Sequence, residues 1–286
     1  MTYLDIAARG NNAPWRYVLA FVLGVVLTIV IGVVAMLYLK HILPPDLSAQ
    51  MIQPTQPVAM LLQSALLFGL LLAGFWAAIA LLHGKRFGDI IGAWRWPAFA
   101  RGLGLWAVAL VALSLLDLAL KPNGFAVTAN GQTAMLAAVA LPALAIQTFA
   151  EEFVFRGYIT QGLLLATRRP WLTAILSGLV FGSMHIPNGA PQAVNAVVFG
   201  VVLALIAIRT RGLAFGYGVH LINNLYGAVV VVSGGDVFHG SPGLFTQTTP
   251  GLMWADVAAA TIALVLAAWL VLSGRFRVES GGPAAS

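Results

Sequence analysis

Two adjacent glutamates lie in the middle of an apolar segment that is long enough to cross a membrane. Glu151 and Glu152 belong to residues 141–165, and Arg156 follows in the same stretch. A charged side chain at the centre of a bilayer costs about 2.5–3.5 kcal/mol on insertion scales, so such residues are expected to pair or to serve a function. In an α-helix, Glu152 and Arg156 share a face, whereas Glu151 points about 100° away. We therefore expect an ion pair between Glu152 and Arg156, and a Glu151 carboxylate that faces a cavity.

Two further polar groups lie in later apolar segments. His185 closes the stretch 181–185, and His220 and Asn224 are four residues apart, so they are expected to share one helix face. Small residues four apart precede both histidines, which favours close helix packing. These glycines are Gly178, Gly182, Gly212 and Gly216.

Together these residue types are sufficient for the attack of water on an amide without a covalent intermediate. A semi-buried glutamate can accept a proton from water, and an imidazole can hold that water or donate to a leaving amine. Histidine and asparagine side chains can donate to a developing oxyanion. Nucleophilic alternatives fit less well, because the chain has no cysteine and no Gly-x-Ser-x-Gly or Ser-x-x-Lys motif. Zinc is an alternative, since a carboxylate and two imidazoles form a known ligand set, although the His-Glu-x-x-His spacing is missing.

The composition predicts the elements that must position these residues. Apolar residues make up 60% of the 286 residues and charged residues 8%, with a mean hydropathy of +0.92. Soluble domains carry about 25% charged residues, so the chain is expected to be an integral membrane protein. A spanning helix needs about 20 apolar residues, and we predict an all-α polytopic transmembrane helix bundle of about eight spans, with residues 1–286 as a single domain. The candidate spans are residues 15–39, 58–82, 102–120, 134–167, 171–186, 192–208, 213–232 and 254–272.

The basic residues predict how this bundle is oriented. Twelve lysines and arginines fall in loops on one side, two fall on the other, and Arg156 lies inside a span. The positive-inside rule then places the richer side, with both termini, in the cytoplasm. Because the net charge of +6 resides in loops beside apolar spans, it does not indicate a nucleic-acid partner. The richer side contains Arg9, Arg16, Lys85, Arg86, Arg95, Arg101, Arg168, Arg169, Arg209, Arg211, Arg275 and Arg277, and the poorer side contains Lys40 and Lys121.

The connecting segments carry weaker signals. Residues 85–101 mix cations with tryptophan and phenylalanine, which predicts an anchor at the level of the lipid headgroups. Asp117 is expected to sit near the outer end of its span beside Lys121. Residues 233–251 are rich in Gly, Ser, Thr and Pro and are expected to form a long outer loop, and the tail 278–286 is expected to be disordered.

Three motifs in order give the chain a resemblance to a known family. Residues 151–156 match EExxxR, residues 181–185 match FxxxH, and residues 220–224 match HxxxN, each inside a predicted span. These are the motifs of the type II CAAX prenyl endopeptidases and their bacterial relatives, the CAAX protease and bacteriocin-processing (Abi) family. The resemblance covers roughly residues 130–235, which it marks as the catalytic core.

The resemblance implies a glutamate-dependent intramembrane endopeptidase on an eight-helix scaffold that uses no metal or other cofactor. In that family the residue matching Glu151 activates water together with the one matching His185. The residues matching His220 and Asn224 stabilise the oxyanion, and those matching Glu152 and Arg156 support the site.

The same resemblance bounds the partners without fixing them. Eukaryotic members cut a prenylated C-terminal tail, whereas bacterial members process other peptides or serve in bacteriocin self-immunity. We expect a membrane-associated peptide or protein as substrate and the lipid bilayer as surroundings, with no nucleic acid and with the oligomeric state left open. The Ala-, Gly- and Arg-rich composition favours a bacterial source, and hence the inner membrane.

Two other functions remain open from the sequence. A non-catalytic immunity or scaffold protein could bind a peptide or a partner helix with the same side chains. A proton-coupled transporter could use glutamate and histidine as a proton relay, although the internal repeat that such transporters often show is not found.

Overall fold

The computed structural model describes residues 2–234, 238, 240–248 and 254–276, and these residues are mostly helical. The predicted disordered tail, residues 278–286, lies outside the described residues. Four of the long helices carry a proline in their first turn. A backbone N–H at that position has no acceptor within the helix, so its absence from proline costs no helical hydrogen bond. The α-helices are α1 (Tyr3–Ala7), α2 (Pro14–Ile42), α3 (Pro45–Ile52), α4 (Pro57–His83), α5 (Phe87–Ile91), α6 (Trp96–Leu120), α7 (Gly131–Glu151), α8 (Thr160–Thr167), α9 (Pro170–Ser183), α10 (Ala190–Thr210), α11 (Ala214–Leu225) and α12 (Trp254–Leu272).

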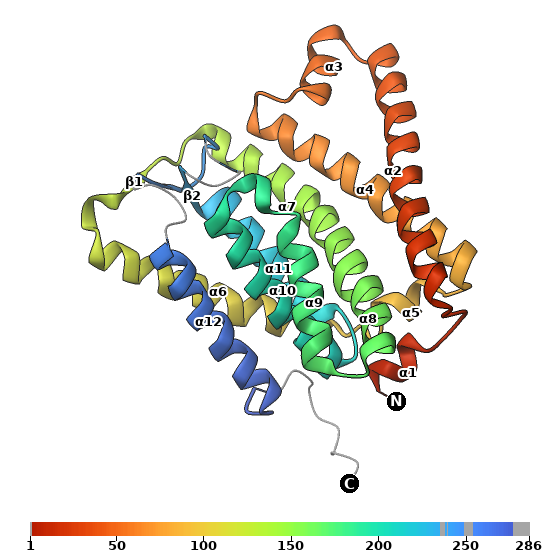
Figure 1. Cartoon of the computed structure of the whole chain (residues 1–286). Helices are drawn as coiled ribbons and strands as arrows, with labels where there is room; N and C mark the ends of the chain where they lie inside the picture. Colours follow the sequence, from red (N-terminus) through yellow and green to blue (C-terminus); the bar gives the residue numbers. More distant parts are fainter. Residues whose placement is uncertain (1, 235–237, 239, 249–253, 277–286) are drawn as a thin grey trace.

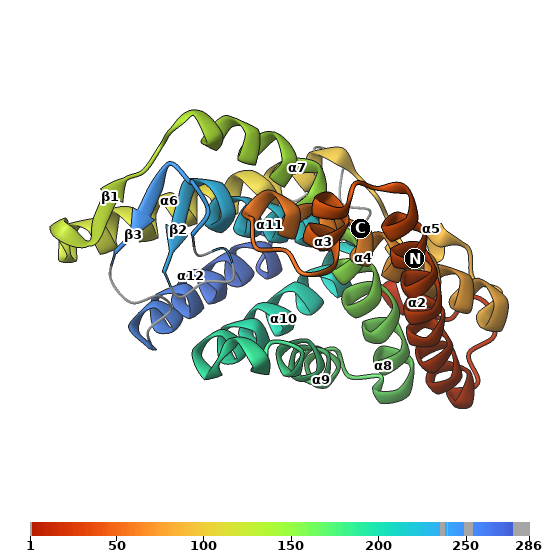
Figure 2. The same ribbon diagram turned by 90° about the horizontal axis from the view of Figure 1, so that it is seen from above.

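The helices form an all-α bundle of the polytopic membrane type, as predicted. Helices α2 and α4 form a V at one side of the molecule, bridged by α3 (Figure 1). Seen from above, α6 and α12 lie at the other side, α11 lies toward the middle, and α9 and α10 pack side by side (Figure 2). Six helices among the described residues are long and apolar enough to cross a membrane. The predicted count of eight spans and the cytoplasmic placement of the termini are not confirmed by this finding.

The difference in span count comes from two short helices. Helix α9 has 14 residues and α11 has 12, which correspond to lengths of about 21 and 18 Å, against a hydrocarbon core of about 30 Å. Irregular backbone follows each of them: the 3₁₀ turn η3 (Ile186–Asn188) after α9, and the π-helix η4 (Tyr226–Val230) after α11. Such backbone is tolerated at membrane depth only where protein buries it or where it lines a water-filled cavity.

A small sheet closes the end of the bundle where α6 finishes and α7 begins. Strand β3 (Phe245–Gln247) pairs antiparallel with β1 (Phe125–Val127) and parallel with β2 (Val231–Ser233). Strand β3 thus lies within the predicted outer loop, residues 233–251, of which residues 235–237, 239 and 249–251 lie outside the described residues. The expected pairing of Asp117 with Lys121 is confirmed at 3.6 Å, and the Gln247 side chain also donates to the Asp117 carboxylate.

The predicted glycine contacts hold for one pair of helices. A Cβ on Gly178 or Gly182 would lie within 3.0 Å of backbone atoms of α10, so these positions set the close approach of α9 to α10. Gly212 plays a different part from the one expected, because it lies outside a helix and pairs with Gly92 in an isolated β-bridge.

The predicted anchor segment, residues 85–101, is buried rather than interfacial at its first residue, Lys85. The side chain of Lys85 is 2% exposed, and its Nζ donates to the Ala7 carbonyl at 2.8 Å and to Gln161 Oε1 at 3.2 Å. Burial lowers the pKa of Lys85 from 10.5 to about 8, partly opposed by the charge of Asp89. The predicted headgroup anchor fits Trp96, which is 66% exposed, but it was wrong for Lys85.

Candidate active site

The glutamate motif begins at Glu151, the last residue of α7, and continues into a π-helix. The segment η2 (Glu152–Ile159) joins α7 to α8 without a break, and its wider turns replace the α-helical geometry that the sequence predicted. Two side chains outside η2 donate to its carbonyls: Thr160 Oγ1, at the start of α8, donates to the Phe155 oxygen at 2.8 Å, and the Tyr3 hydroxyl of α1 donates to the Arg156 oxygen at 2.7 Å. Short π-helical insertions of this kind occur often at functional sites.

The predicted ion pair between Glu152 and Arg156 is present in the core. Arg156 Nη1 lies 3.3 Å from Glu152 Oε1, and the two side chains are 0% and 1% exposed. The guanidinium carbon also lies 4.0 Å from the centroid of the Phe181 ring, a cation–π arrangement. Within the described residues the Arg156 nitrogens make no hydrogen bond, so charge attraction and the ring face hold the guanidinium.

His220 stands between the two glutamates. Its Nδ1 lies 2.8 Å from Glu152 Oε1, and its Nε2 lies 3.4 Å from Glu151 Oε2. Because the Glu152 carboxylate is paired with Arg156 and can only accept, the His220 Nδ1 must carry the proton of that hydrogen bond. In a neutral ring, the lone pair of Nε2 then faces Glu151.

Glu151 is held differently from its neighbour. It lines the cavity and accepts a long hydrogen bond of 3.4 Å from Gln147 Nε2, one helical turn earlier. Within the described residues, no hydrogen bond or ion pair joins Glu151 to His185. The structure thus brings Glu151 next to His220, and this contact was not part of the roles that the sequence suggested.

His185 lies just after the short helix α9, between its C-cap Met184 and the turn η3. Its Nδ1 lies 3.0 Å from the Phe181 carbonyl oxygen, which can only accept, so Nδ1 carries the proton and Nε2 is left as an acceptor. The Phe181 ring packs 4.6 Å from the His185 ring and 5.9 Å from the His220 ring, between centroids. One aromatic side chain therefore positions both histidines as well as Arg156.

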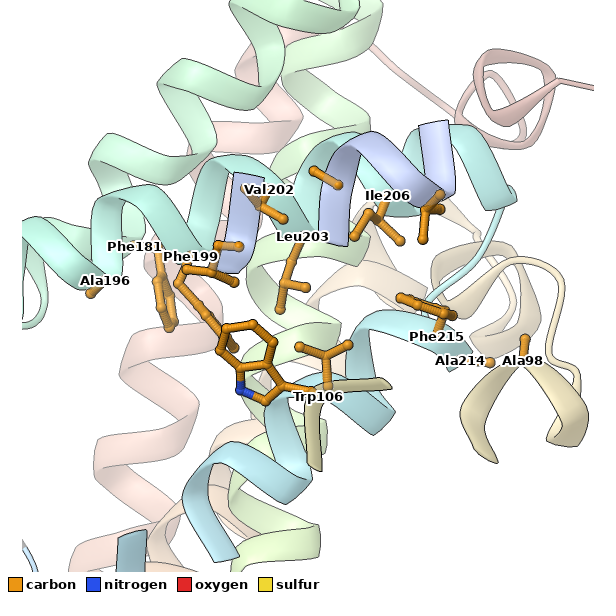
Figure 3. Close-up of a cluster of buried hydrophobic side chains, with 14 residues drawn as sticks. Ala98, Trp106, Phe181, Ala196, Phe199, Val202, Leu203, Ile206, Ala214 and Phe215 are labelled. Carbon is orange, nitrogen blue, oxygen red and sulfur yellow. The ribbon is translucent and has the colours of Figure 1, made fainter. Parts of the chain in front are cut away.

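Asn224 is oriented through a chain of two hydrogen bonds. Trp106 Nε1 donates to Asn223 Oδ1 at 3.0 Å, and Asn223 Nδ2 donates to Asn224 Oδ1 at 3.3 Å. An indole N–H can only donate, so it fixes the rotation of the Asn223 amide and, through it, that of Asn224. The Nδ2 donors of Asn224 remain for another partner. Trp106 lies beside Phe199 in the buried cluster of Figure 3, with ring centroids 6.3 Å apart.

All four predicted catalytic residues line one cavity of about 830 Å³. These are Glu151, His185, His220 and Asn224. The wall also includes polar side chains that the sequence did not single out, namely Gln147, Asn188, Gln192, Asn195 and Asn223. Scattered single amides in apolar segments give no motif, and their position in four different elements shows only in the fold. No group of three or more His, Asp or Glu side chains in the described part of the chain is placed to hold a metal ion, and the expectation of no cofactor stays a prediction.

Comparison with known proteins agrees with the motifs. Residues 133–226 match the model of the type II CAAX prenyl endopeptidase Rce1-like family, which confirms the resemblance over this part of the chain. The chain is also 27% identical over 275 residues to the "Uncharacterized protein YyaK" of Bacillus subtilis (strain 168), covering 91% of this chain and 92% of that protein. No solved structure matches the chain.

Proposed function

We propose that this integral membrane protein is an intramembrane endopeptidase, in which Glu151 activates water to hydrolyse a peptide bond of a membrane-associated peptide or protein. The family matched by residues 133–226 consists of CAAX-type proteases, which supports a hydrolase in general. The observation that carries the finer proposal is the division of labour between two neighbouring glutamates. Glu152 is paired with Arg156 in the core, while Glu151 reaches the cavity beside His220.

In the first step, a water molecule in the cavity attacks the carbonyl carbon of the scissile bond. Glu151 accepts a proton from this water as its oxygen forms the new bond to carbon. The free Nε2 of His185 is an acceptor and can hold the second proton of the water in a hydrogen bond. His220 Nε2, at 3.4 Å, can share the proton that Glu151 has taken.

Negative charge then develops on the former carbonyl oxygen. The Nδ2 donors of Asn224 are fixed in orientation by Asn223 and Trp106, and they stabilise this oxyanion. When the carbon–nitrogen bond breaks, the proton held by Glu151 passes to the leaving nitrogen as an amine forms. Water supplies all the atoms added, so the step needs no other reactant.

His220 receives a role different from the one that the resemblance alone implied. Its Nδ1 proton is committed to Glu152, and its Nε2 lies 3.4 Å from Glu151 Oε2. We assign to His220 the role of sharing a proton with Glu151, and to Asn224 the role of stabilising the oxyanion. Glu152 and Arg156 then serve to hold the His220 ring in this tautomer.

The proposal extends to the surroundings of the protein. The asymmetry of lysine and arginine supports eight crossings with both termini in the cytoplasm, in which the short helices α9 and α11 reach the cavity instead of a full bilayer thickness. The inner membrane of a bacterium is the proposed location.

The test compares the termini of membrane proteins in cells that express the wild type and cells that express Glu151→Gln. We expect new N- and C-termini that occur only with the wild type, and they would also name the substrate. Identical termini at equal expression would overturn the protease and favour an immunity or scaffold role. Proton-dependent flux in wild-type vesicles that is lost in Glu151→Gln, with no new termini, would instead favour a transporter.

A further inference from the structure

The loops that carry most of the basic residues pack together at one end of the molecule. Arg9 Nη1 lies 2.7 Å from Asp89 Oδ1, which ties the N-terminal segment to α5. The Ala93 backbone N–H donates to the Arg211 oxygen at 2.8 Å, which ties the start of α6 to the start of α11. We call this end, made up of residues 2–16, 84–101, 168–169 and 209–213, the basic end. Figure 1 shows α1 at the opposite end of the bundle from β1 and β2.

The cavity belongs to the other half of the bundle. Its wall reaches from the Glu151 and His220 side chains to Lys121 at the end of α6 and to Ser233 and Gln247 of the sheet. Among the described residues that line it, no cation comes from the basic end. The cavity therefore extends from the reactive groups toward the sheet.

Toward the basic end, the same groups are covered by buried side chains. Arg156, Thr160 and Gln161 are each 0% exposed, and they lie directly after the glutamates along the chain. The Gln161 amide donates to the Asp89 oxygen at 2.7 Å, while its Oε1 accepts from Lys85. This layer of hydrogen-bonded side chains separates the reactive glutamate from the basic end.

We infer that the cavity opens to the non-cytoplasmic face of the membrane, so that its substrates are polypeptide segments presented from that side. That the cavity receives a substrate depends on the proposed function, whereas the direction in which the cavity opens does not. Cytoplasmic loops carry the excess of lysine and arginine in membrane proteins. With twelve such residues on one side and two on the other, the basic end faces the cytoplasm.

The cavity wall also limits the chemistry of the substrate. On the side of α2 and α4, the lining residues are all apolar, and one of them, Phe21, is 42% exposed. Toward the sheet the lining carries amides, hydroxyls and the Asp117–Lys121 pair. The apolar wall would contact the part of a peptide that remains in the bilayer, and the polar wall would contact the part that has been exported. The apolar lining residues of α2 and α4 are Phe21, Val25, Phe68, Leu71 and Phe75.

The absence of cysteine from the sequence makes a direct labelling test possible. Single cysteines would be placed in the full-length protein at a cavity position (Asn188→Cys), at the sheet end (Ala129→Cys) and at the basic end (Arg169→Cys). All three positions are exposed in the structure. Intact spheroplasts would be treated with a sulfonated maleimide that does not cross membranes, before and after permeabilisation.

We expect labelling of Asn188→Cys and Ala129→Cys in intact spheroplasts, and labelling of Arg169→Cys only after permeabilisation. The reverse pattern would overturn the inference, because it would open the cavity to the cytoplasm. Labelling of Ala129→Cys without any labelling of Asn188→Cys would also overturn it, since the cavity would then be closed to water.

The labelling separates this inference from the proposed function. Adding Glu151→Gln to the Asn188→Cys variant is expected to leave the labelling rate within about twofold, because access does not require catalysis. Labelling from outside together with unchanged protein termini would refute the protease while leaving the direction of the opening established.

Discussion

The V-shaped pair α2–α4 and the helices α7 to α11 are both apolar by composition, but they use their side chains in different ways. In the most apolar 18-residue window of α2 only 11% of the residues are buried, against 50% in α10. Helix α2 is 29 residues long, whereas α9 has 14 and α11 has 12. Long helices turned outward meet lipid, and short helices turned inward bring polar side chains and irregular backbone to a cavity. Length and direction, more than hydrophobicity, therefore separate the membrane anchor from the reactive core.

The largest difference between the two regions is expected for Glu151→Gln. This change removes the proposed base while keeping the size of the side chain and its contact with Gln147. Removing a general base lowers a rate by about 10²–10⁴-fold, so cleavage should fall by at least about 100-fold with an unchanged thermal midpoint in detergent. Cleavage would be measured as the amount of each new protein terminus found in membranes.

The matched control lies in the other region. Ile29 on α2 is 59% exposed on the outer surface, and Ile29→Ala should leave both cleavage and thermal midpoint unchanged. An equal loss in the two variants would contradict the division into anchor and core.

The next largest effect is expected on stability, from Arg156→Met. The change leaves the Glu152 carboxylate buried without its cation, and breaking a buried ion pair in this way costs about 3–5 kcal/mol. We expect a much lower thermal midpoint in detergent and a lower yield of folded protein. The double variant Arg156→Met with Glu152→Gln should recover part of that loss, because no unpaired charge remains. A single variant as stable as the wild type would contradict the ion pair.

The glutamate pair also shows how far the sequence predicts the site. The spacing of Glu152 and Arg156 correctly gave their contact, and the four residues that the motifs single out as catalytic line one cavity, although their roles stay a prediction. The spacing could not show the π-helix, because apolar residues fill both an α-helical and a π-helical turn equally well. It also could not place His220 between the glutamates, since that contact depends on how α11 packs against η2.

A smaller effect on cleavage alone is expected from Trp106→Phe. The ring keeps its place beside Phe199, but the N–H that orients the Asn223 amide is lost. Leaving such an acceptor unsatisfied costs about 1–3 kcal/mol, so the maximal cleavage rate should fall by about tenfold while KM changes little. Trp96→Phe is the control, because Trp96 is 66% exposed and far along α6 from Asn223. A purely structural role for Trp106 would instead lower the thermal midpoint without changing the rate at low temperature.

The smallest effect is a dependence of stability on pH, at the basic end. Burial lowers the pKa of Lys85 to about 8 in the folded protein, against 10.5 for the free side chain. Between these two values the unfolded chain binds more protons than the folded one, so the free energy of unfolding rises with pH in this window. The thermal midpoint should rise from pH 8 to 10, and Lys85→Met should remove this part of the rise. A thermal midpoint that changes with pH in the same way in the wild type and in Lys85→Met would contradict the lowered pKa of Lys85.

Lys85 also marks the part of the fold that the sequence could not predict. A cation next to tryptophan and phenylalanine is typical of a headgroup anchor, and its buried partners lie 78 and 76 residues away, at Ala7 and Gln161. The sheet was missed for a related reason: three-residue strands drawn from separate segments show no alternation that could be recognised. Long apolar helices, in contrast, were predicted closely because each satisfies its own backbone hydrogen bonds.

The hydrogen bond from Tyr3 to the Arg156 carbonyl has a consequence for biosynthesis. It joins residues 153 positions apart, so α1 leaves the ribosome long before its partner exists. At roughly 5–20 residues per second, the delay is about 8–30 s. During that time the Tyr3 hydroxyl must be satisfied by water or by a chaperone, whereas the partner of the Ala7 carbonyl, Lys85, lies only 78 positions later. We therefore expect the beginning of the chain to complete its folding only after the glutamate-bearing span has been inserted. The rate of translation over residues 84–161 should then affect the yield of folded protein.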